Sequence, residues 1–357
     1  MKPVPKSPDW MLSALEERRQ QNLMRRTVTM DSPQIPRAKI NTQDYAAFCS
    51  NDYLGLANHP ALIQALHDTA QEYGVGGGSS HLVCGHLTPH QQLEDALADW
   101  LGYERVMLFS TGYMANLGVI SALAGKGRPV IQDKLNHASL IDGALLAQAT
   151  MRRYLHGDVA SAEKLLSRST DSGLLITDGV FSMDGDVAPL SELSNLAIKH
   201  DWMFMVDDAH GLGCLGEDGR GCLSLAGLDA ERLPILVGTF GKAFGTAGAF
   251  VATSHEYADY LTQFARPYIY TTAMSPAMAG ATLASLRIIQ SSEGQERRDR
   301  LAAHIAYFRQ RMQSLPVVLM ASETAIQPIL MGDSKTALQI SERLKSLGVW
   351  CTAIRPP

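Results

Sequence analysis

The sequence predicts an α/β protein with a mostly parallel central sheet and a smaller α+β domain after it. From about residue 45 onward, short apolar runs alternate with helical patterns, which is typical of such a sheet. Several runs are apolar at consecutive positions, as expected for strands covered by helices on both faces. A charged stretch at Ser291–Arg300 then separates this alternation from a second set of elements. We therefore expect an N-terminal helical arm at 1–44, a large α/β domain at 45–288 and a small domain at 289–357.

Residues 1–30 should form an amphipathic helix, because four apolar side chains interleave with charged ones: Trp10, Leu12, Leu15 and Leu23. Pro33 and Pro36 break that pattern. In the large domain, the expected strands are Val106–Phe109, Pro129–Gln132, Leu174–Thr177, Met203–Val206, Ile235–Val237 and Ala249–Ala252. The gaps between them hold helical patterns such as Gln91–Leu101, Ala115–Leu123 and Leu190–Lys199.

The small domain has fewer signals. Its charged start is either a solvated helix or a junction between domains. After it we expect Leu301–Leu315, a strand at Ile326–Met331, a helix at Lys335–Leu347 and a strand at Val349–Ile354.

The composition excludes several classes of function. The 357 residues carry a formal charge of −5 and no basic stripe, which argues against nucleic acid as a partner. No apolar run approaches the roughly 18 residues that a membrane span needs, and the first residues lack the apolar core of an export signal. Charged residues make up only 19% of the chain, which favours extensive burial and a subunit interface. We expect a cytoplasmic protein with no membrane partner.

The five cysteines support a reducing compartment. They are scattered, odd in number and contain no C-x-x-C pair. This pattern fits neither a disulfide scaffold nor a zinc module. For Cys84 and Cys214, which lie near the motifs described next, a buried free thiol is the favoured interpretation.

Four features fall where parallel sheets bind ligands, at the carboxyl ends of strands. Gly112 and Tyr113 begin a helix directly after a strand, and backbone N–H groups at such a start can seat a phosphate. An ordinary βα turn would have the same pattern. Asn136-His137-Ala138-Ser139 follows the next strand, and its imidazole could stack on an aromatic ligand, although a lone His is more often structural.

The other two features carry charge. Asp207 and Asp208 directly follow an apolar strand, where a carboxylate could pair with a cationic ring nitrogen and His210 could touch the same ligand. A capping Asp with a surface His is the alternative. Lys242 lies in an apolar, glycine-rich loop after another strand. Burial there would lower its pKa and make it an amine nucleophile, whereas a surface lysine is the alternative.

Two further motifs do not support a ligand site. The glycines at 74–78 follow a helical pattern instead of a strand, which argues against a nicotinamide dinucleotide loop. His81, His86 and His90 lack a carboxylate or cysteine pattern that would complete a metal site, so we expect no metal.

Together the four features suit a ligand with a phosphate, a basic aromatic ring and an aldehyde. Pyridoxal 5′-phosphate (PLP) meets that description. The 242 − 207 = 35 residues between Asp207 and Lys242 leave room for a helix and a strand, as a site on a sheet requires.

At this point the chain resembles the α-oxoamine synthases, PLP enzymes with the aspartate-aminotransferase fold (fold type I). The resemblance runs through almost the whole chain and is carried by five motifs: 50–56 (SNDYLGL), 136–139 (NHAS), 178–185 (DGVFSMDG), 206–211 (VDDAHG) and 239–242 (TFGK). Segments 263–266, 269–272 and 352–357 are most similar to the branch that condenses L-alanine with a pimeloyl thioester, as its CoA or acyl-carrier-protein form, in biotin biosynthesis.

The resemblance implies roles for individual residues. Lys242 would hold PLP covalently and move the α-proton of the amino acid, Asp207 would keep the ring nitrogen protonated, His137 would stack on the ring and His210 would contact its phenolic oxygen. The remaining cofactor contacts would come from Gly112, Tyr113, Ser182, Thr239, Thr271 and Thr272, the last two from the neighbouring subunit of a homodimer. Substrate contacts would involve Arg25, Asn51, His137 and Thr352.

Alternatives remain at this stage. Sister enzymes that use glycine or serine, such as 2-amino-3-oxobutyrate CoA ligase and 5-aminolevulinate synthase, share the motifs, and Asp178 stands where the alanine-using branch more often has Glu. His81 replaces a Gly or Arg of the family. A catalytically impaired paralogue and a non-PLP binding protein are the more distant possibilities. The family also continues past Arg355-Pro356-Pro357 and there supplies an arginine for the substrate carboxylate, so we expect this chain to bind PLP but to turn over poorly.

Overall fold

The computed structural model describes residues 7–355, and its contacts divide the chain into two compact units. One unit contains residues 51–315 and 319–328, and the other contains residues 1–50, 316–318 and 329–357. Each unit is described by itself. The N-terminal and C-terminal segments share a unit because strand β2 (Gln43–Ala47) pairs in parallel with β12 (Val349–Trp350). The sequence predicts three parts, at 1–44, 45–288 and 289–357, and these boundaries stay predictions.

The larger unit is built on a seven-stranded sheet, which confirms the predicted α/β class. The strand order is β3-β9-β8-β7-β6-β4-β5, and β9 runs antiparallel to both of its neighbours while the other pairs are parallel. The strands are β3 (Arg105–Phe109), β4 (Val130–Asp133), β5 (Met151–Tyr154), β6 (Leu174–Asp178), β7 (Met203–Asp207), β8 (Ile235–Thr239) and β9 (Ala249–Thr253). Six of these seven coincide with the apolar runs of the sequence.

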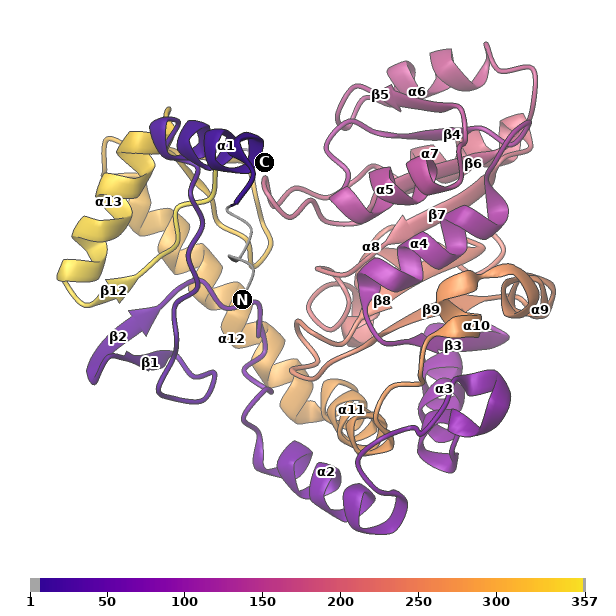
Figure 1. The fold of residues 1–357 in the computed structure, drawn as a ribbon, viewed down its shortest axis with the longest axis horizontal. Helices are drawn as coiled ribbons and strands as arrows, with labels where there is room; N and C mark the ends of the chain where they lie inside the picture. Colours follow the sequence, from indigo (N-terminus) through magenta and orange to yellow (C-terminus); the bar gives the residue numbers. More distant parts are fainter. Residues whose placement is uncertain (1–6, 356–357) are drawn as a thin grey trace, which may run out of the picture. The chain divides into compact units, whose positions relative to one another are not determined.

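Helices cover both faces of this sheet (Figure 1). In β7, Phe204 and Val206 pack into the cluster that includes side chains of α3, α6, α7 and α11, while Met205 packs on the opposite face with α4, α5 and α9. Because successive strand side chains point to opposite faces, a strand buried on both sides is apolar at every position. The helices of this unit are α2 (Pro60–Tyr73), α3 (Thr88–Leu101), α4 (Gly112–Leu123), α5 (Ala138–Leu146), α6 (Val159–Leu166), α7 (Leu190–His200), α8 (Gly221–Leu225), α9 (His255–Phe264), α10 (Arg266–Tyr270), α11 (Pro276–Ile289) and α12 (Ser292–Met312). Short π and 3₁₀ turns lie at His81–Gly85 and Glu217–Gly219.

The smaller unit contains a three-stranded sheet in the order β1-β2-β12. Strand β1 (Arg37–Ile40) and β2 form a hairpin whose two turn residues, Asn41 and Thr42, both have positive φ. Such a turn matches the twist of antiparallel strands, and Asn tolerates it better than most residues. The helices are α1 (Asp9–Gln20) and α13 (Ser334–Ser346). A two-stranded sheet pairs β10 (Val318–Leu319) with β11 (Ile329–Leu330).

Three of the predicted elements were wrong in extent. The N-terminal helix ends at Gln20, because Asn22 is left-handed and the N–H groups of Asn22 and Leu23 bond to Arg19 and Arg18 in a Schellman motif. Residues 1–6 of the predicted 1–30 helix lie outside the described part of the chain.

In the C-terminal part, the charged stretch expected as a helix or a junction is a helix, and two predicted strands are too long. The charged stretch at Ser291–Arg300 is the first half of a single helix, α12, whose N-terminus is capped by the hydroxyl of Ser291. The strands predicted at Ile326–Met331 and Val349–Ile354 each shrink to two residues in β11 and β12.

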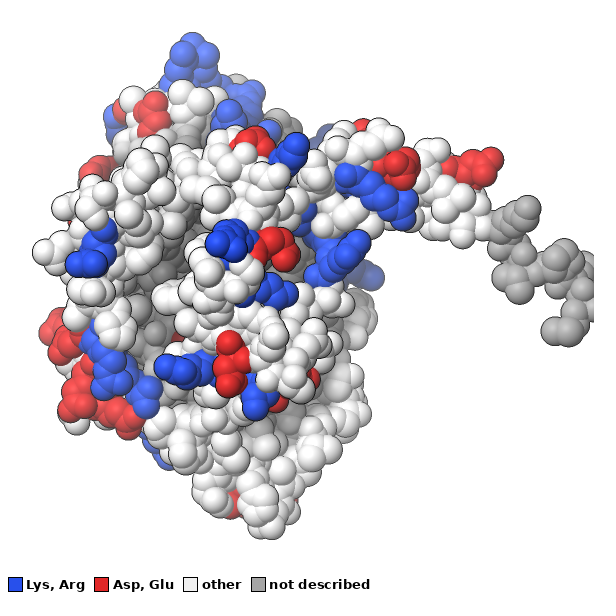
Figure 2. All heavy atoms as spheres, turned by 90° about the vertical axis from the view of Figure 1, so that its left-hand side faces the viewer, with Lys and Arg blue, Asp and Glu red and all other residues white. Residues whose placement is uncertain are grey.

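The described surface carries mixed charge. On the face viewed in Figure 2, Lys and Arg side chains are interspersed with Asp and Glu, and large areas between them consist of other residues. No helix among residues 7–355 is both long and apolar enough to cross a membrane.

Candidate active site

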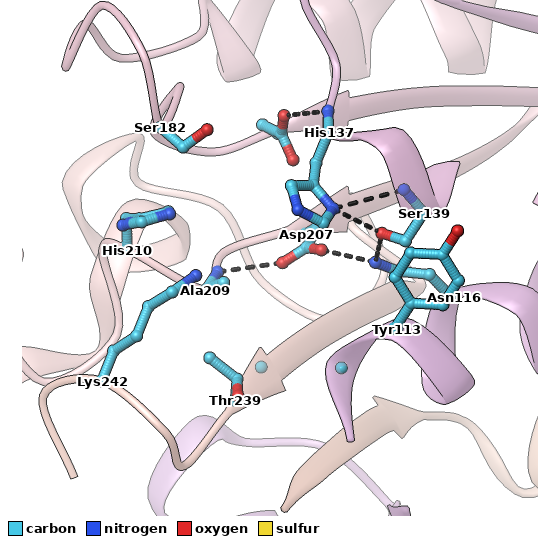
Figure 3. Close-up of a pocket in the computed structure, with 13 residues that line it drawn as sticks. Tyr113, Asn116, His137, Ser139, Ser182, Asp207, Ala209, His210, Thr239 and Lys242 are labelled. Carbon is cyan, nitrogen blue, oxygen red and sulfur yellow. Dashed lines mark hydrogen bonds between the residues drawn. The ribbon is translucent and has the colours of Figure 1, made fainter. Parts of the chain in front are cut away.

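A cavity opens in the larger unit where β6, β7 and β8 end and α4 and α5 begin (Figure 3). The four residues that the sequence singled out for covalent, ring and stacking contacts, Lys242, Asp207, His137 and His210, all line it. The other lining residues are Gly112, Tyr113, Asn116, Ser139, Asp178, Ser182, Ala209, Gly238 and Thr239. Residues that the sequence places at the carboxyl ends of different strands therefore meet at one cavity.

Lys242 is held in place by its aromatic neighbours. Phe240 and Phe244 are fully buried on either side of it and pack edge to face with 5.4 Å between ring centroids. Truncating a buried phenylalanine of this kind costs about 3–5 kcal/mol, so the loop is firmly anchored. Gly245 closes the turn with φ +67°, and a Cβ there would lie 2.4 Å from the backbone nitrogen of Ala57. Only glycine permits both the conformation and the close approach.

The setting of Lys242 lowers the pKa of its side chain. Burial lowers the pKa of its ammonium group, and the carboxylates of Asp207 and Asp178 oppose that effect in part. A lysine whose pKa is lowered by burial supplies a nucleophilic amine at a lower pH than a surface lysine does. This agrees with the interpretation of the loop as the place of a carbonyl-binding lysine.

The two consecutive aspartates have different surroundings. Asp207 lies at the end of β7, where its Oδ1 accepts the N–H of Ala209 at 3.0 Å and its Oδ2 accepts the side-chain amide of Asn116 at 2.6 Å. Asp208 does not line the cavity; it is completely buried and accepts the backbone N–H of Cys222 at 2.7 Å. Burial raises the pKa of Asp208 to about 7. Of these two aspartates only Asp207 lines the cavity, and Asp208 supports the turn behind it.

His137 is the N-cap of α5 and is fixed from two sides. Its backbone N–H donates to the carboxylate of Asp178 at 2.7 Å, and its Nδ1 lies 2.8 Å from the hydroxyl of Ser139. Burial, followed by the nearby Asp207, raises the pKa of Asp178 well above its usual range. The ring of Tyr113 stands edge-on to the imidazole at 6.4 Å.

His210 faces the cavity from the turn after β7. Its Nδ1 lies 2.7 Å from the hydroxyl of Tyr53, a residue that the sequence did not assign to the site. Burial, and then the positive charge of Lys242, lowers the pKa of His210 to about 3. The imidazole is therefore neutral throughout the physiological pH range.

The start of α4 lines the cavity and presents backbone N–H groups there. Thr111 caps this 12-residue helix by accepting the N–H of Met114 at 3.2 Å. Gly112 faces Thr239, and a Cβ on the glycine would lie 3.7 Å from the Cβ of that threonine. Thr239 Oγ1 donates to the carbonyl of Gly248 and accepts the N–H of Gly241. Helix N–H groups and a hydroxyl beside them are suited to an anion.

Several predicted contacts do not line this cavity. Thr271 and Thr272 are absent from its lining, and the carbonyl of Thr272 accepts the hydroxyl of Ser110 at 3.3 Å. Asn51 is exposed and accepts the hydroxyl of Tyr53 at 3.3 Å. Arg25 and Thr352 belong to the smaller unit. Their assignments stay predictions.

Asn116 and Ser139 also line the cavity, although the sequence pattern indicated no role for either. Asn116 is 1% exposed in a helix otherwise composed of apolar and small residues and one serine, 112–123 (GYMANLGVISAL). A buried amide in such a helix requires partners, and this was the available signal. Ser139 belongs to segment 136–139, whose sequence pattern indicated a role only for His137.

The rejected motifs are accounted for by local structure. The glycines at 74–78 follow helix α2, as the sequence indicated. His90 uses both ring nitrogens, since Nδ1 accepts the N–H of Leu87 and Nε2 bonds to the carbonyl of Met274. Among the described residues, His156 with Asp184 and Asp186 has metal-like spacing, but the imidazole bonds to Asp133 at 3.0 Å and to Asp186 at 2.9 Å.

Comparison with known proteins gives a consistent result. Residues 43–357 match the aminotransferase class I and II family. An 8-amino-7-oxononanoate synthase of Marinomonas sp. (strain MWYL1) is 81% identical over 357 residues, which is all of this chain and 89% of the relative. The crystal structure of an 8-amino-7-oxononanoate synthase from Francisella tularensis is 32% identical with a TM-score of 0.77, covering 88% of this chain and 89% of that one.

A second solved structure is a serine palmitoyltransferase from S. paucimobilis with a bound PLP–myriocin aldimine. It is 31% identical with a TM-score of 0.90 and covers 96% of this chain and 90% of its own. The fold is therefore PLP fold type I, as predicted. By its family match, its 81% identical relative and its sheet, this chain belongs to the class I and II aminotransferase family, in the branch of the 8-amino-7-oxononanoate synthases.

Proposed function

We propose that this chain makes 8-amino-7-oxononanoate by condensing L-alanine with a pimeloyl thioester, with release of CO₂ and the free thiol. Its family fixes the cofactor as PLP and the reaction class as acyl transfer of the α-oxoamine synthase type. The observation that carries the proposal is that Lys242, Asp207, His137 and His210 meet at one cavity in a chain so close to a named synthase.

The groups around the cavity fit that cofactor. The start of α4 and the hydroxyl of Thr239 suit its phosphate, Asp207 suits a protonated ring nitrogen, and the amine of Lys242 suits its aldehyde. His137 lies where an imidazole can cover one face of the ring. When bound, the cofactor supplies an electron sink that stabilises negative charge at the α-carbon of the amino acid.

The residues of the chain provide orientation and proton control. Lys242 Nζ would hold the cofactor covalently and would take the α-proton of alanine, and burial lowers the pKa of this amine. Asp207 holds a proton at the ring nitrogen, because its two oxygens are already oriented by Ala209 and Asn116. The neutral imidazole of His210 can hydrogen-bond to the phenolic oxygen without adding charge.

Substrate contacts and assembly extend the proposal. Ser182 lines the cavity and Asn51 precedes Tyr53, so we place both on the amino-acid side. Arg25 and Thr352 are assigned to the acyl substrate. We assign Thr271 and Thr272 to the phosphate of a neighbouring subunit in a homodimer. The five cysteines are all unpaired, which supports a reducing, cytoplasmic location.

The proposal is tested with the purified protein and PLP. L-Alanine, glycine and L-serine are compared for their effect on the absorbance of bound PLP and for thiol release from pimeloyl-CoA. We expect only L-alanine to give 8-amino-7-oxononanoate by mass spectrometry. A selective response to glycine or serine would reassign the chain to a sister activity. Binding of PLP without turnover of any amino acid would identify an impaired paralogue.

Sedimentation measurements test the assembly separately. A homodimer with shared sites predicts that Thr272→Ala weakens PLP binding even though Thr272 does not line the cavity of its own chain. A monomer with full PLP affinity would contradict this part of the proposal and leave the reaction untouched.

A further inference from the structure

Asn116 occupies a place where its orientation is fixed by charge. It is 1% exposed, and its Nδ2 donates one N–H to Asp207 Oδ2 at 2.6 Å and the other to Ser139 Oγ at 2.8 Å. The side-chain oxygen of Asn116 has no protein partner. A flipped amide would place that oxygen against the carboxylate, and two acceptors repel each other. The carboxylate of Asp207 and the amide of Asn116 therefore fix each other's orientation.

Ser139 extends the connection to His137. Because its oxygen accepts from Asn116, its own O–H is free to donate to His137 Nδ1 at 2.8 Å. The backbone N–H of Ser139 donates to the same nitrogen at 3.3 Å. A ring nitrogen that receives N–H and O–H donors carries no proton itself, so the proton of the neutral imidazole is on Nε2.

Figure 3 shows these hydrogen bonds as one continuous network, which runs from Ala209 through Asp207, Asn116 and Ser139 to His137. The network joins three separate elements, β7, α4 and the start of α5. We infer that Asn116 and Ser139 are positioning residues, which couple the carboxylate of Asp207 to the imidazole of His137 and set the orientation of both toward the cofactor ring. The inference rests on the proposed cofactor site and is independent of which amino acid is used.

The coupling has a measurable consequence. Without the amide of Asn116, Asp207 keeps only the N–H of Ala209 and can rotate away from the ring nitrogen. Without the hydroxyl, the imidazole of His137 keeps only the longer bond from the backbone N–H of Ser139. Each loss should weaken PLP binding and change the angle at which the ring is held. Once one link is broken, breaking the other should add little.

The test compares PLP binding by Asn116→Leu, Ser139→Ala and the double variant. Dissociation constants come from absorbance titration, and circular dichroism of the visible PLP band reports ring orientation. Asn116→Leu is expected to raise the dissociation constant by about 10-fold or more, since bonds to charged groups are the strong ones, and Ser139→Ala by about 3-fold. The double variant should lose less than the product of the two, and the circular dichroism band should change in each.

Ser121→Ala is the matched control. Ser121 lies on the same helix, bonds to the carbonyl of Leu117 and does not line the cavity. The PLP affinity and circular dichroism of Ser121→Ala should equal those of the unmodified chain. If Asn116→Leu fails to fold, Ser139→Ala still tests the coupling, because it removes only one oxygen atom.

Unchanged PLP affinity and circular dichroism in Ser139→Ala, or fully multiplicative losses in the double variant, would overturn the coupling. Failure of the unmodified chain to bind PLP would instead overturn the proposed function.

Discussion

The hydroxyl of Tyr53 lies 2.7 Å from Nδ1 of His210 and ties the segment before α2 to the turn that follows β7. Both groups stay uncharged at neutral pH. Burial raises the pKa of Tyr53, and burial together with Lys242 lowers the pKa of His210 to about 3. The bond therefore joins two neutral groups and holds the imidazole at the cavity without introducing a charge beside Lys242.

Replacing Tyr53 by Phe tests this relationship. The variant keeps the ring and loses the hydrogen bonds to His210 and, at the exposed side, to Asn51, each of which contributes about 0.5–1.5 kcal/mol. Because His210 then loses the partner that orients it, kcat should fall by about 10-fold, while thermal stability changes little. Steady-state kinetics and a thermal melt measure the two effects. Equal kcat in the variant would show that His210 is oriented by other contacts.

Lys242→Ala should abolish the covalent hold on the cofactor. Phe240 and Phe244 on either side stay buried, so the loop should keep its shape. The expected result is a protein that folds and binds PLP only reversibly, with loss of the visible band of the covalently bound cofactor and of turnover. Borohydride treatment followed by mass spectrometry checks this directly. A modified lysine elsewhere in the chain would reassign the role.

Asp207→Asn tests the pairing with the ring nitrogen. The amide keeps the size of the side chain but removes the negative charge that stabilises a protonated ring. General acid–base contributions of this kind are about 10²–10⁴-fold, so we expect a fall of at least about 100-fold in kcat. Asp208→Asn is the comparison, because Asp208 is buried and does not line the cavity. Its main effect should be on stability.

Much of the fold could be predicted because the signals were local. Strands such as β6 and β7 are apolar at nearly every position, and their carboxyl ends placed Asp207 correctly. Strand β5 was missed because Arg152 and Arg153 are exposed at the edge of the sheet, where no apolar run is required.

Other features depend on pairs of residues far apart in the sequence. The pairing of β2 with β12 joins the two ends of the chain, and nothing in either segment indicates its partner. Tyr53 and His210 are 157 positions apart, and Asn116 and Asp207 are 91 apart. A sequence pattern can indicate that a buried amide needs a partner, but only the folded sheet determines which one it finds.

Glu94 gives a prediction for the pH dependence of stability. This carboxyl group is 6% exposed on α3, and its Oε1 accepts the N–H of Leu108 at 3.1 Å. Burial raises its pKa from 4.5 to about 8. Between those two values the folded protein holds a proton that the unfolded chain has released, so Glu94 makes the free energy of unfolding fall as pH rises from about 4.5 to about 8.

Glu94→Gln should therefore remove this part of the pH dependence. Glutamine can keep the bond to Leu108 through its oxygen and is never ionised. The variant should be more stable than the unmodified chain at pH 8, on the order of a few kcal/mol, and nearly equal to it at pH 4.5. Urea denaturation across this range measures the difference. Gln92→Ala, two residues earlier on the same helix and exposed, is the control and should leave the slope unchanged. A constant difference between Glu94→Gln and the unmodified chain at every pH would show that packing, and not the ionisation of Glu94, determines it.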